Sequence, residues 1–287
     1  MTGAVGALEP LSSGARHTMI LVNGVAADAL PATDRGLAYG DGVFRTLRMC
    51  RGQPVAWPDH YRKLQHDCAA LGIPCPERET LLPEVLQASG PFTDAVAKII
   101  ITRGSGERGY APPERPDPTR IVMAAPLSDN RQIATSGIKA RVCTLRLGAQ
   151  PALAGVKHLN RLENVLARRE WSDPDIREGL LLDEAGDVVG GTMSNLFIVE
   201  SAILITPVLE RTGVAGVTRQ RILERAVRSD VACRVERMPL ERVRCAAEMF
   251  FVNSVIGVWP VRELEGRTWD VGPVAARVRQ WLDEGGD

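Results

Sequence analysis

Short runs of β-branched and apolar residues mark most of the first half of the chain as strand-forming, with one interruption of helical period. The strand-like runs are 19–24, 43–50, 95–102 and 120–127. Between the second and third runs, apolar residues recur at spacings of three, four and three after Pro58, a residue common in the first turn of helices. This pattern predicts a helix whose apolar positions are Tyr61, Leu64, Cys68 and Leu71.

Strand-like runs dominate the second half. They lie at 138–147, 195–199, 202–207, 231–238 and 248–255. A hairpin that turns at Ala185 and Gly186 is expected over 179–191, because two apolar runs flank a short polar turn. Helical periods predict three more helices, at about His158 to Trp171, at 218–229 and at 273–284.

These elements predict a mixed α/β (α+β) fold of two domains, a smaller N-terminal α/β domain over 18–128 and a larger, β-rich C-terminal domain over 137–287. Residues 129–136 have the composition of a linker, and the small, Gly- and Ser-rich residues 1–17 that of a mobile tail. A long polar loop, 103–118, separates two predicted strands of the first domain. Long loops on compact domains are usually functional or disordered.

Composition and charge exclude several classes of protein. The 287 residues include 35 Lys and Arg against 35 Asp and Glu, so the formal charge is zero and nucleic acid is not expected as a general partner. The 45% of hydrophobic and 24% of charged residues are ordinary globular values. No apolar stretch is long enough to span a membrane and the N-terminus lacks a signal-peptide pattern, so we expect a cytoplasmic protein without a membrane partner.

The cysteines indicate neither a metal site nor a disulfide framework. They lie far apart, and none forms the C-x-x-C or histidine spacing of a zinc site. We expect buried thiols in a reducing cytoplasm. The six are Cys50, Cys68, Cys75, Cys143, Cys233 and Cys245.

One lysine, Lys157, stands immediately before a predicted helix and two residues after Gly155. Most lysines are solvated, and a solvated lysine at a helix start is the simplest interpretation. A cation there opposes the helix dipole, however, and a glycine lets the backbone pass close to a neighbour. A lysine that attacks a carbonyl as a neutral amine would need such surroundings to lower its pKa.

Three other places offer groups that bind anions. Val217 and Thr218 follow Gly216 at the start of a predicted helix, and Ser254 interrupts a strand. The loop over 103–118 carries arginines on a flexible backbone suited to a carboxylate. Each place also has an ordinary structural interpretation, as a helix cap, a buried hydroxyl or a polar surface loop.

The order of several longer motifs carries a resemblance to a known family. The chain contains AYGDGVFRTLR, HYRKL, ITRGSGERGY, LAGVKHLNRLENVLARR, SNLF and VAGVTRQ, in that order. This set resembles the class IV, or fold-type IV, pyridoxal-phosphate enzymes from Thr18 onward. Within that class, the third and fourth motifs are similar to those of the 4-amino-4-deoxychorismate lyases. The resemblance implies pyridoxal 5'-phosphate as cofactor, a homodimer, and conversion of 4-amino-4-deoxychorismate to 4-aminobenzoate and pyruvate.

The resemblance also implies roles for residues on the cofactor side. Lys157 is expected to form the Schiff base with pyridoxal phosphate, and Val217, Thr218 and Ser254 to hold the phosphate. Asn195 matches the segment that passes near the cofactor.

Lys63 stands where the class usually has an arginine against the phosphate, so it supplies charge without a bidentate fork. Neighbouring Arg62 is the alternative source of that grip.

On the substrate side, the resemblance implies that Arg108 and Tyr110 reach a substrate across the dimer interface. Arg146 is a second candidate for a substrate carboxylate. Thr46 is expected to assist Lys157 in protonating the departing enol.

One position departs from the class. A glutamate that pairs with the pyridine nitrogen is replaced by Gly190, and the nearby acids Glu184 and Asp187 lie at a hairpin turn. Two alternatives therefore stay open. The chain is a class IV aminotransferase acting on a D-amino acid, a branched-chain amino acid or an amine, or it is a homologue that has lost catalysis.

Overall fold

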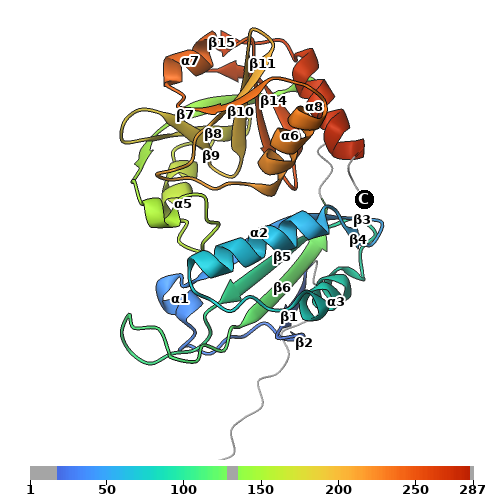
Figure 1. Ribbon diagram of the computed structural model, residues 1–287, viewed down its shortest axis with the longest axis vertical. Helices are drawn as coiled ribbons and strands as arrows, with labels where there is room; N and C mark the ends of the chain where they lie inside the picture. The colour runs from blue at the N-terminus through green and yellow to red at the C-terminus, as the bar shows by residue number, and fades with distance from the viewer. Residues whose placement is uncertain (1–17, 128–134, 285–287) are drawn as a thin grey trace, which may run out of the picture.

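A computed structural model describes residues 18–127 and 135–284. It consists of two sheets with their helices, one above the other in Figure 1. The first sheet is antiparallel throughout, in the order β2-β1-β6-β5-β3-β4. Its strands are β1 (Met19–Val22), β2 (Val25–Ala26), β3 (Gly42–Cys50), β4 (Gln53–Pro54), β5 (Ala95–Thr102) and β6 (Arg120–Pro126).

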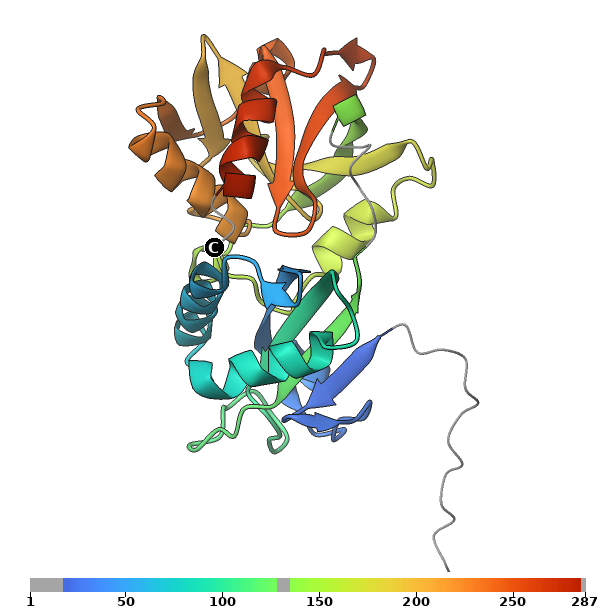
Figure 2. The ribbon, with the colours of Figure 1, turned by 90° about the vertical axis from the view of Figure 1, so that its right-hand side faces the viewer.

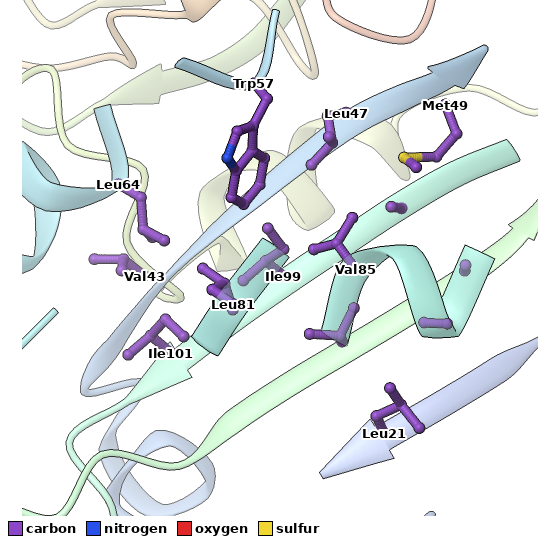
Figure 3. Packing of buried hydrophobic residues seen from close by; sticks show 14 of the residues in the cluster. Leu21, Val43, Leu47, Met49, Trp57, Leu64, Leu81, Val85, Ile99 and Ile101 are labelled. Atoms are coloured by element: carbon purple, nitrogen blue, oxygen red, sulfur yellow. The ribbon is translucent and has the colours of Figure 1, made fainter. Parts of the chain in front are cut away.

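Helices accompany the first sheet, and two of them cover one of its faces. They are α1 (Arg35–Tyr39), α2 (Trp57–Ala70) and α3 (Arg78–Ser89), of which α2 and α3 pack on the sheet (Figures 1 and 2). Alternate residues of a strand point to opposite faces, so Val43, Leu47 and Met49 of β3 are buried beneath these helices. Figure 3 shows these side chains with Leu64 of α2.

The opposite face of β3 is polar and aromatic and belongs to the site described below. Phe44 and Thr46 are half-buried there, and the neighbouring strand presents Val96 on the same side.

The second sheet is mixed. Nine strands join it, in the order β12-β11-β10-β13-β14-β7-β8-β9, with β15 paired to β14. The pairs β7 with β8, β7 with β14, and β11 with β12 are parallel. The strands are β7 (Ile138–Leu147), β8 (Ile176–Asp183), β9 (Val188–Gly191), β10 (Asn195–Glu200), β11 (Ile203–Pro207), β12 (Cys233–Glu236), β13 (Glu248–Asn253), β14 (Gly257–Leu264) and β15 (Arg267–Thr268).

The central strands of this sheet are buried on both faces. On β10, Phe197 packs into the cluster with α6 and α8, whereas Leu196 and Ile198 belong to the cluster on the other side. Burial on both faces explains their continuous apolar runs. The helical segments are η1 (Pro151–Leu153), α5 (Leu162–Arg168), α6 (Val217–Arg228), α7 (Leu240–Cys245) and α8 (Pro273–Glu284).

The predicted strands and the hairpin at Gly186 are present, but some expectations were wrong. The helix expected from His158 begins at Leu162, because the preceding residues pair with β3 instead. Neither α3 nor β14 was predicted, since each contains a proline, Pro83 and Pro260, that weakens the pattern. The expected tail, and residues 129–134 of the expected linker, lie outside the described residues.

All six cysteines are free. The expectation that they are buried holds for Cys68 and Cys143, but Cys245 is exposed. No helix in the described ranges is both long and apolar enough to cross a membrane.

Candidate active site

A cavity of about 570 Å³ lies between the two sheets. Its wall combines residues of β3 and α2 with the segment 147–164, the turn between β9 and β10, and the segments 212–218 and 253–256. Residues far apart in sequence therefore meet in one place, as expected for a binding site between two structural units.

The backbone of Lys157 is fixed on both sides. Its carbonyl accepts a hydrogen bond from Phe44 N (3.0 Å), and its own N–H donates to Asp67 Oδ2 (3.1 Å). His158 forms an isolated antiparallel bridge with Val43. The lysine is thus held by β3 and α2 rather than by a helix end.

The surroundings of the Lys157 side chain favour a neutral amine. Its Nζ lies 4.3 Å from the centroid of the Phe44 ring. Burial, with the positive charges of Arg45 and Arg161, lowers the pKa of Lys157 to about 7. A substantial fraction of this amine is therefore a nucleophile at neutral pH.

Asp67 organises the cations behind the lysine. This fully buried carboxylate accepts from Arg45 Nη2 and Lys63 Nζ as well as from the Lys157 N–H. Burial alone would raise the pKa of Asp67, but the charges of Arg45 and Lys63 outweigh it and hold that pKa below its usual value. Asp67 therefore remains ionised and its hydrogen bonds persist at neutral pH.

The N-terminus of α6 opens into the cavity. Asn195 Nδ2 donates to Val214 O (2.7 Å), and its Oδ1 accepts from Gly216 N (3.1 Å). A Cβ atom at Gly216 would lie 2.3 Å from Asn195 Oδ1, so the close approach requires glycine there. No side chain caps the helix at Gly216, which leaves N–H groups of the first turn available to an anion.

Two hydroxyls stand beside this helix end. Thr218 Oγ1 and Ser254 Oγ are 3.1 Å apart, and both residues line the cavity. Asn253 holds the turn that carries Ser254, because its Oδ1 accepts from Val255 N (2.8 Å) and Ile256 N (2.9 Å). Hydroxyls and helix N–H groups together are a typical cradle for phosphate.

Positive charge predominates in the cavity wall. Arg45, Lys157 and Arg161 line it, and among the described residues the one acidic side chain in the wall is Glu163. Glu163 Oε1 is already bonded to Gly148 N (3.0 Å). This balance favours an anionic ligand.

Glu178 holds the turn between β9 and β10 in place through hydrogen bonds. Its carboxylate accepts from Thr192 N (2.9 Å) and Ser194 Oγ (2.7 Å), and also from Thr192 Oγ1. Burial raises the pKa of Glu178, and these donors counteract the shift. The cavity wall at 192–194 is positioned by a residue that does not itself line the cavity.

Most residues singled out from the sequence lie together in this cavity. Those in its wall are Thr46, Lys157, Gly190, Asn195, Val217, Thr218 and Ser254. Lys63 is not in the wall, because its ammonium is bound to Asp67 and to Gly155 O (2.9 Å). Arg62 lies away from the cavity and pairs with Asp59 (3.0 Å).

The three substrate-side residues of the sequence analysis lie outside the wall. Arg108 and Tyr110 are exposed, on a loop at the end of the first unit farthest from the second sheet (Figures 1 and 2). Arg146 is exposed too, and its Nη1 donates to Cys143 O (2.5 Å) and Thr144 O (3.0 Å). Within one chain, these residues do not meet Lys157, and their roles stay predictions.

The comparison with known families decides the family of this chain. A family model described as amino-transferase class IV matches residues 42–264. The chain belongs to the class IV aminotransferase family. Enzymes of this class IV family use pyridoxal phosphate.

Individual relatives include lyases and aminotransferases. The aminodeoxychorismate lyase of Vibrio harveyi is 35% identical over 246 residues, which are 85% of this chain and 90% of the lyase. A crystal structure of 4-amino-4-deoxychorismate lyase from Pseudomonas aeruginosa shares 42% identity at a TM-score of 0.88, covering 93% of this chain and 98% of that one. A putative branched-chain-amino-acid aminotransferase of Methanocaldococcus jannaschii is 30% identical over 272 residues, 91% of this chain and 94% of that protein. The fold is thus the fold-type IV architecture expected from the motifs.

The residues present fit the cofactor of the class IV family. Three buried nitrogen atoms of the cavity wall have no partner in the described residues, namely Arg45 Nε, His60 Nδ1 and His158 Nδ1. Buried polar groups are normally satisfied, so a wall with an unpaired arginine N–H and two unpaired imidazole nitrogens suits a polar, anionic ligand. Lys157 supplies the amine that an aldehyde requires. Among the described residues no cluster of acidic, histidine or cysteine side chains suits a metal ion.

Sequence reasoning missed Arg45, His60, Asp67, Arg161 and Glu178. Arg45 offered a signal, since it occupies an inward position between Val43 and Leu47 on an otherwise apolar strand face. A buried arginine needs a partner, and Asp67 on the adjacent helix provides it.

Proposed function

We propose that the chain is an aminodeoxychorismate lyase, which converts 4-amino-4-deoxychorismate into 4-aminobenzoate and pyruvate. The observation that carries the proposal is Lys157, an amine of lowered pKa in a cavity with unpaired anion-binding groups. The identities to the lyases of Vibrio harveyi and Pseudomonas aeruginosa, which exceed that to the Methanocaldococcus jannaschii aminotransferase, support elimination as the reaction. Gly190 supports it as well, because a site without a carboxylate at the pyridine nitrogen hinders transamination more than elimination.

The residues around the cavity divide the work of holding the cofactor. Lys157 binds the aldehyde through its neutral amine, and the N–H groups at Val217 and Thr218, with the Ser254 hydroxyl, hold the phosphate. Asn195 positions the N-terminus of α6 through its hydrogen bonds to Val214 O and Gly216 N. When bound, pyridoxal phosphate supplies an electron-accepting ring that stabilises negative charge on the substrate carbon bearing the amine.

Lys157 and Thr46 move the protons. With the substrate amine held in the cavity, Lys157 Nζ would act as the general base that removes the proton from the carbon bearing that amine. The C–O bond to the enolpyruvyl group then breaks, and the electron pair leaves with the enol of pyruvate. Thr46, which lies in the same cavity, or Lys157 returns the proton to that enol. The remaining ring becomes aromatic, so the reaction needs no oxidant.

Substrate carboxylates need further cations. Arg161 lines the cavity and donates from Nε to His158 O (3.0 Å), which orients its guanidinium. We assign one carboxylate to Arg161. Arg108 and Tyr110 are retained as substrate-binding residues delivered by a second copy of the chain in a cytoplasmic homodimer, and Arg146 as a third candidate.

The test measures both products. Purified protein loaded with pyridoxal phosphate is expected to release 4-aminobenzoate and pyruvate in a 1:1 ratio from 4-amino-4-deoxychorismate. Lys157→Ala is expected to lower that rate by at least about a thousandfold, since binding and proton transfer depend on one amine. Lys139→Ala, a change at a half-buried ion pair outside the cavity wall, is the matched control and should retain the rate.

The same protein is then mixed with D-alanine, L-alanine or L-leucine. Conversion of the cofactor to its pyridoxamine form, without 4-aminobenzoate release, would replace the lyase by an aminotransferase. Neither reaction, with cofactor bound, would identify a homologue that has lost catalysis.

A further inference from the structure

The cation expected to grip the cofactor phosphate does not face the cavity. Lys63 occupies that place in the sequence pattern, but its ammonium donates hydrogen bonds to Asp67 and to Gly155 O (2.9 Å). Lys63 is absent from the cavity wall, and Arg62 pairs with Asp59 elsewhere. The phosphate end therefore needs another source of positive charge.

Arg45 has the required position. It is 2% exposed on β3, lines the cavity, and is anchored through Nη2 to Asp67. Its Nε–H, however, is buried without an acceptor in the described part of the chain. Asp67 accepts from Arg45 Nη2, from Lys63 Nζ and from the Lys157 N–H, but not from Arg45 Nε. A guanidinium N–H without an acceptor, in a residue that lines the cavity, is a donor available to an anion.

His60 lies in the same cavity wall as Arg45 and the N-terminus of α6. His60 lines the cavity, and its Nδ1 is likewise buried without a partner in the described residues. Burial, with the charges of Arg45, Arg221 and Lys157, lowers the pKa of His60 to about 3. Arg221 stands one helical turn beyond Thr218 on α6, and His60 lines the same cavity as Val217 and Thr218.

We propose that Arg45, and not Lys63, is the residue that binds the phosphate of pyridoxal 5'-phosphate in this protein, donating its free Nε–H to that anion. Asp67 holds the guanidinium in place, and Lys63 serves as a second counter-ion that keeps Asp67 charged. The chain thus retains an arginine at the phosphate, supplied by a strand instead of the first long helix. The proposal rests on the family's cofactor and not on the lyase reaction, so it stands or falls independently of turnover.

The test separates phosphate binding from general stability. Dissociation constants of cofactor-free protein are measured for pyridoxal 5'-phosphate and for pyridoxal, which lacks the phosphate. The dissociation constant for pyridoxal divided by that for pyridoxal 5'-phosphate reports the contribution of the phosphate to affinity. Arg45→Met is expected to reduce that ratio at least tenfold, and the matched variant Lys63→Met less than threefold. A smaller loss in Arg45→Met, or an equal loss in Lys63→Met, would overturn the proposal.

Two further variants keep the test valid if Arg45→Met does not fold. Removal of Arg45 alone leaves the buried Asp67 carboxylate with one counter-ion fewer, which can destabilise the fold. The double variant Arg45→Met with Asp67→Asn removes both charges and should show the same tenfold loss in the ratio. Arg45→Lys keeps the positive charge but lacks the Nε–H donor, so its ratio of dissociation constants should lie between those of the unmodified protein and Arg45→Met. A full wild-type ratio in Arg45→Lys would overturn the role of the guanidinium. The ³¹P resonance of the bound cofactor should shift in Arg45→Lys and stay unchanged in Lys63→Met.

Discussion

At Lys157, three influences act on one amine. Burial is the largest and lowers the pKa, the cations Arg45 and Arg161 lower it further, and Asp67 opposes them. The result, a pKa of about 7, separates this lysine from an exposed one near 10.5. The fold therefore supplies a nucleophile at neutral pH without a dedicated base.

Attachment of the cofactor should follow this pKa. We expect the rate at which cofactor-free protein reacts with pyridoxal phosphate to rise with pH through a midpoint near 7 and to level off above 8.5, because only the neutral amine attacks. Stopped-flow absorbance over pH 5–10 measures it. Arg161→Met should raise the midpoint, since a repelling cation is lost. A midpoint near 10 would show that Lys157 behaves as an exposed lysine.

Gly190 stands where the class has a glutamate, so this position lacks a carboxylate. A Cβ atom there would lie 2.9 Å from Ser194 O, so any side chain must displace the turn. We expect Gly190→Ala to lower the free energy of unfolding by about 1–3 kcal/mol. Relative to that control, Gly190→Glu should bind the cofactor more tightly and transaminate D- or L-alanine faster, because a carboxylate favours a protonated ring. Half-reaction kinetics check this. Rapid transamination by the unmodified protein would contradict it.

The sequence predicted the residues whose motif is local and missed those defined by contacts. Lys157, Thr218 and Asn195 stand in short recognisable segments, and all three line the cavity. The link between Arg45 and Asp67 joins β3 to α2, and the register of a helix on a sheet cannot be read from either segment alone.

At the scale of elements, the strands were the more predictable part. Buried strands such as β5 and β7 are continuous or alternating apolar runs, and their ranges match the sequence pattern. Helix α5 was predicted too long because tertiary hydrogen bonds between the segment before it and β3 overrode a helical pattern. For example, Leu159 N donates to Gly42 O at 2.9 Å.

Arg35 at the start of α1 fastens the long loop over 103–118. Its guanidinium donates to the carbonyls of Gly109 (3.1 Å), Tyr110 (3.0 Å) and Ala111 (3.3 Å), and its Nε pairs with Asp41 (2.9 Å). Arg35 is therefore a main anchor of a loop rich in glycine and proline, together with the bridge between Asp34 and Ser105. This contact could not be predicted from the sequence, because Arg35 lies about seventy residues away from the loop.

Loss of this side chain should release the loop. We expect Arg35→Ala to speed tryptic cleavage after Arg108 at least tenfold and to lower the free energy of unfolding by about 1–3 kcal/mol. Limited proteolysis followed by mass spectrometry measures the cleavage. Arg48→Ala, at an exposed position of β3, is the control and should cleave as the unmodified protein does. Equal cleavage of both variants would mean that other contacts hold the loop.

At the scale of the whole molecule, apolar surface remains open beside the cavity. Leu162, Val165 and Leu166 of α5 are 76%, 52% and 49% exposed, and Met193 in the cavity wall is 49% exposed. Contiguous exposed apolar residues mark interaction sites. The loop with Arg108 lies at the end of the first unit farthest from the second sheet (Figures 1 and 2), so a second copy of the chain would have to deliver such a loop to the cavity. We propose that this copy also covers α5.

A mixture of two inactive variants tests whether the copies share sites. Lys157→Ala lacks the amine but keeps the loop, and Arg108→Ala keeps the amine but lacks the arginine. After dissociation and reassociation of equal amounts, half of the dimers are mixed, and each mixed dimer holds one complete site, so activity should reach about a quarter of the unmodified level. The parents measured separately supply the baseline. Leu166→Glu, which places a charge on the exposed face of α5, should weaken association and lower activity on dilution. A mixture no more active than the mean of its parents would place Arg108 outside the partner's site, and the loop would then be a surface feature of each chain.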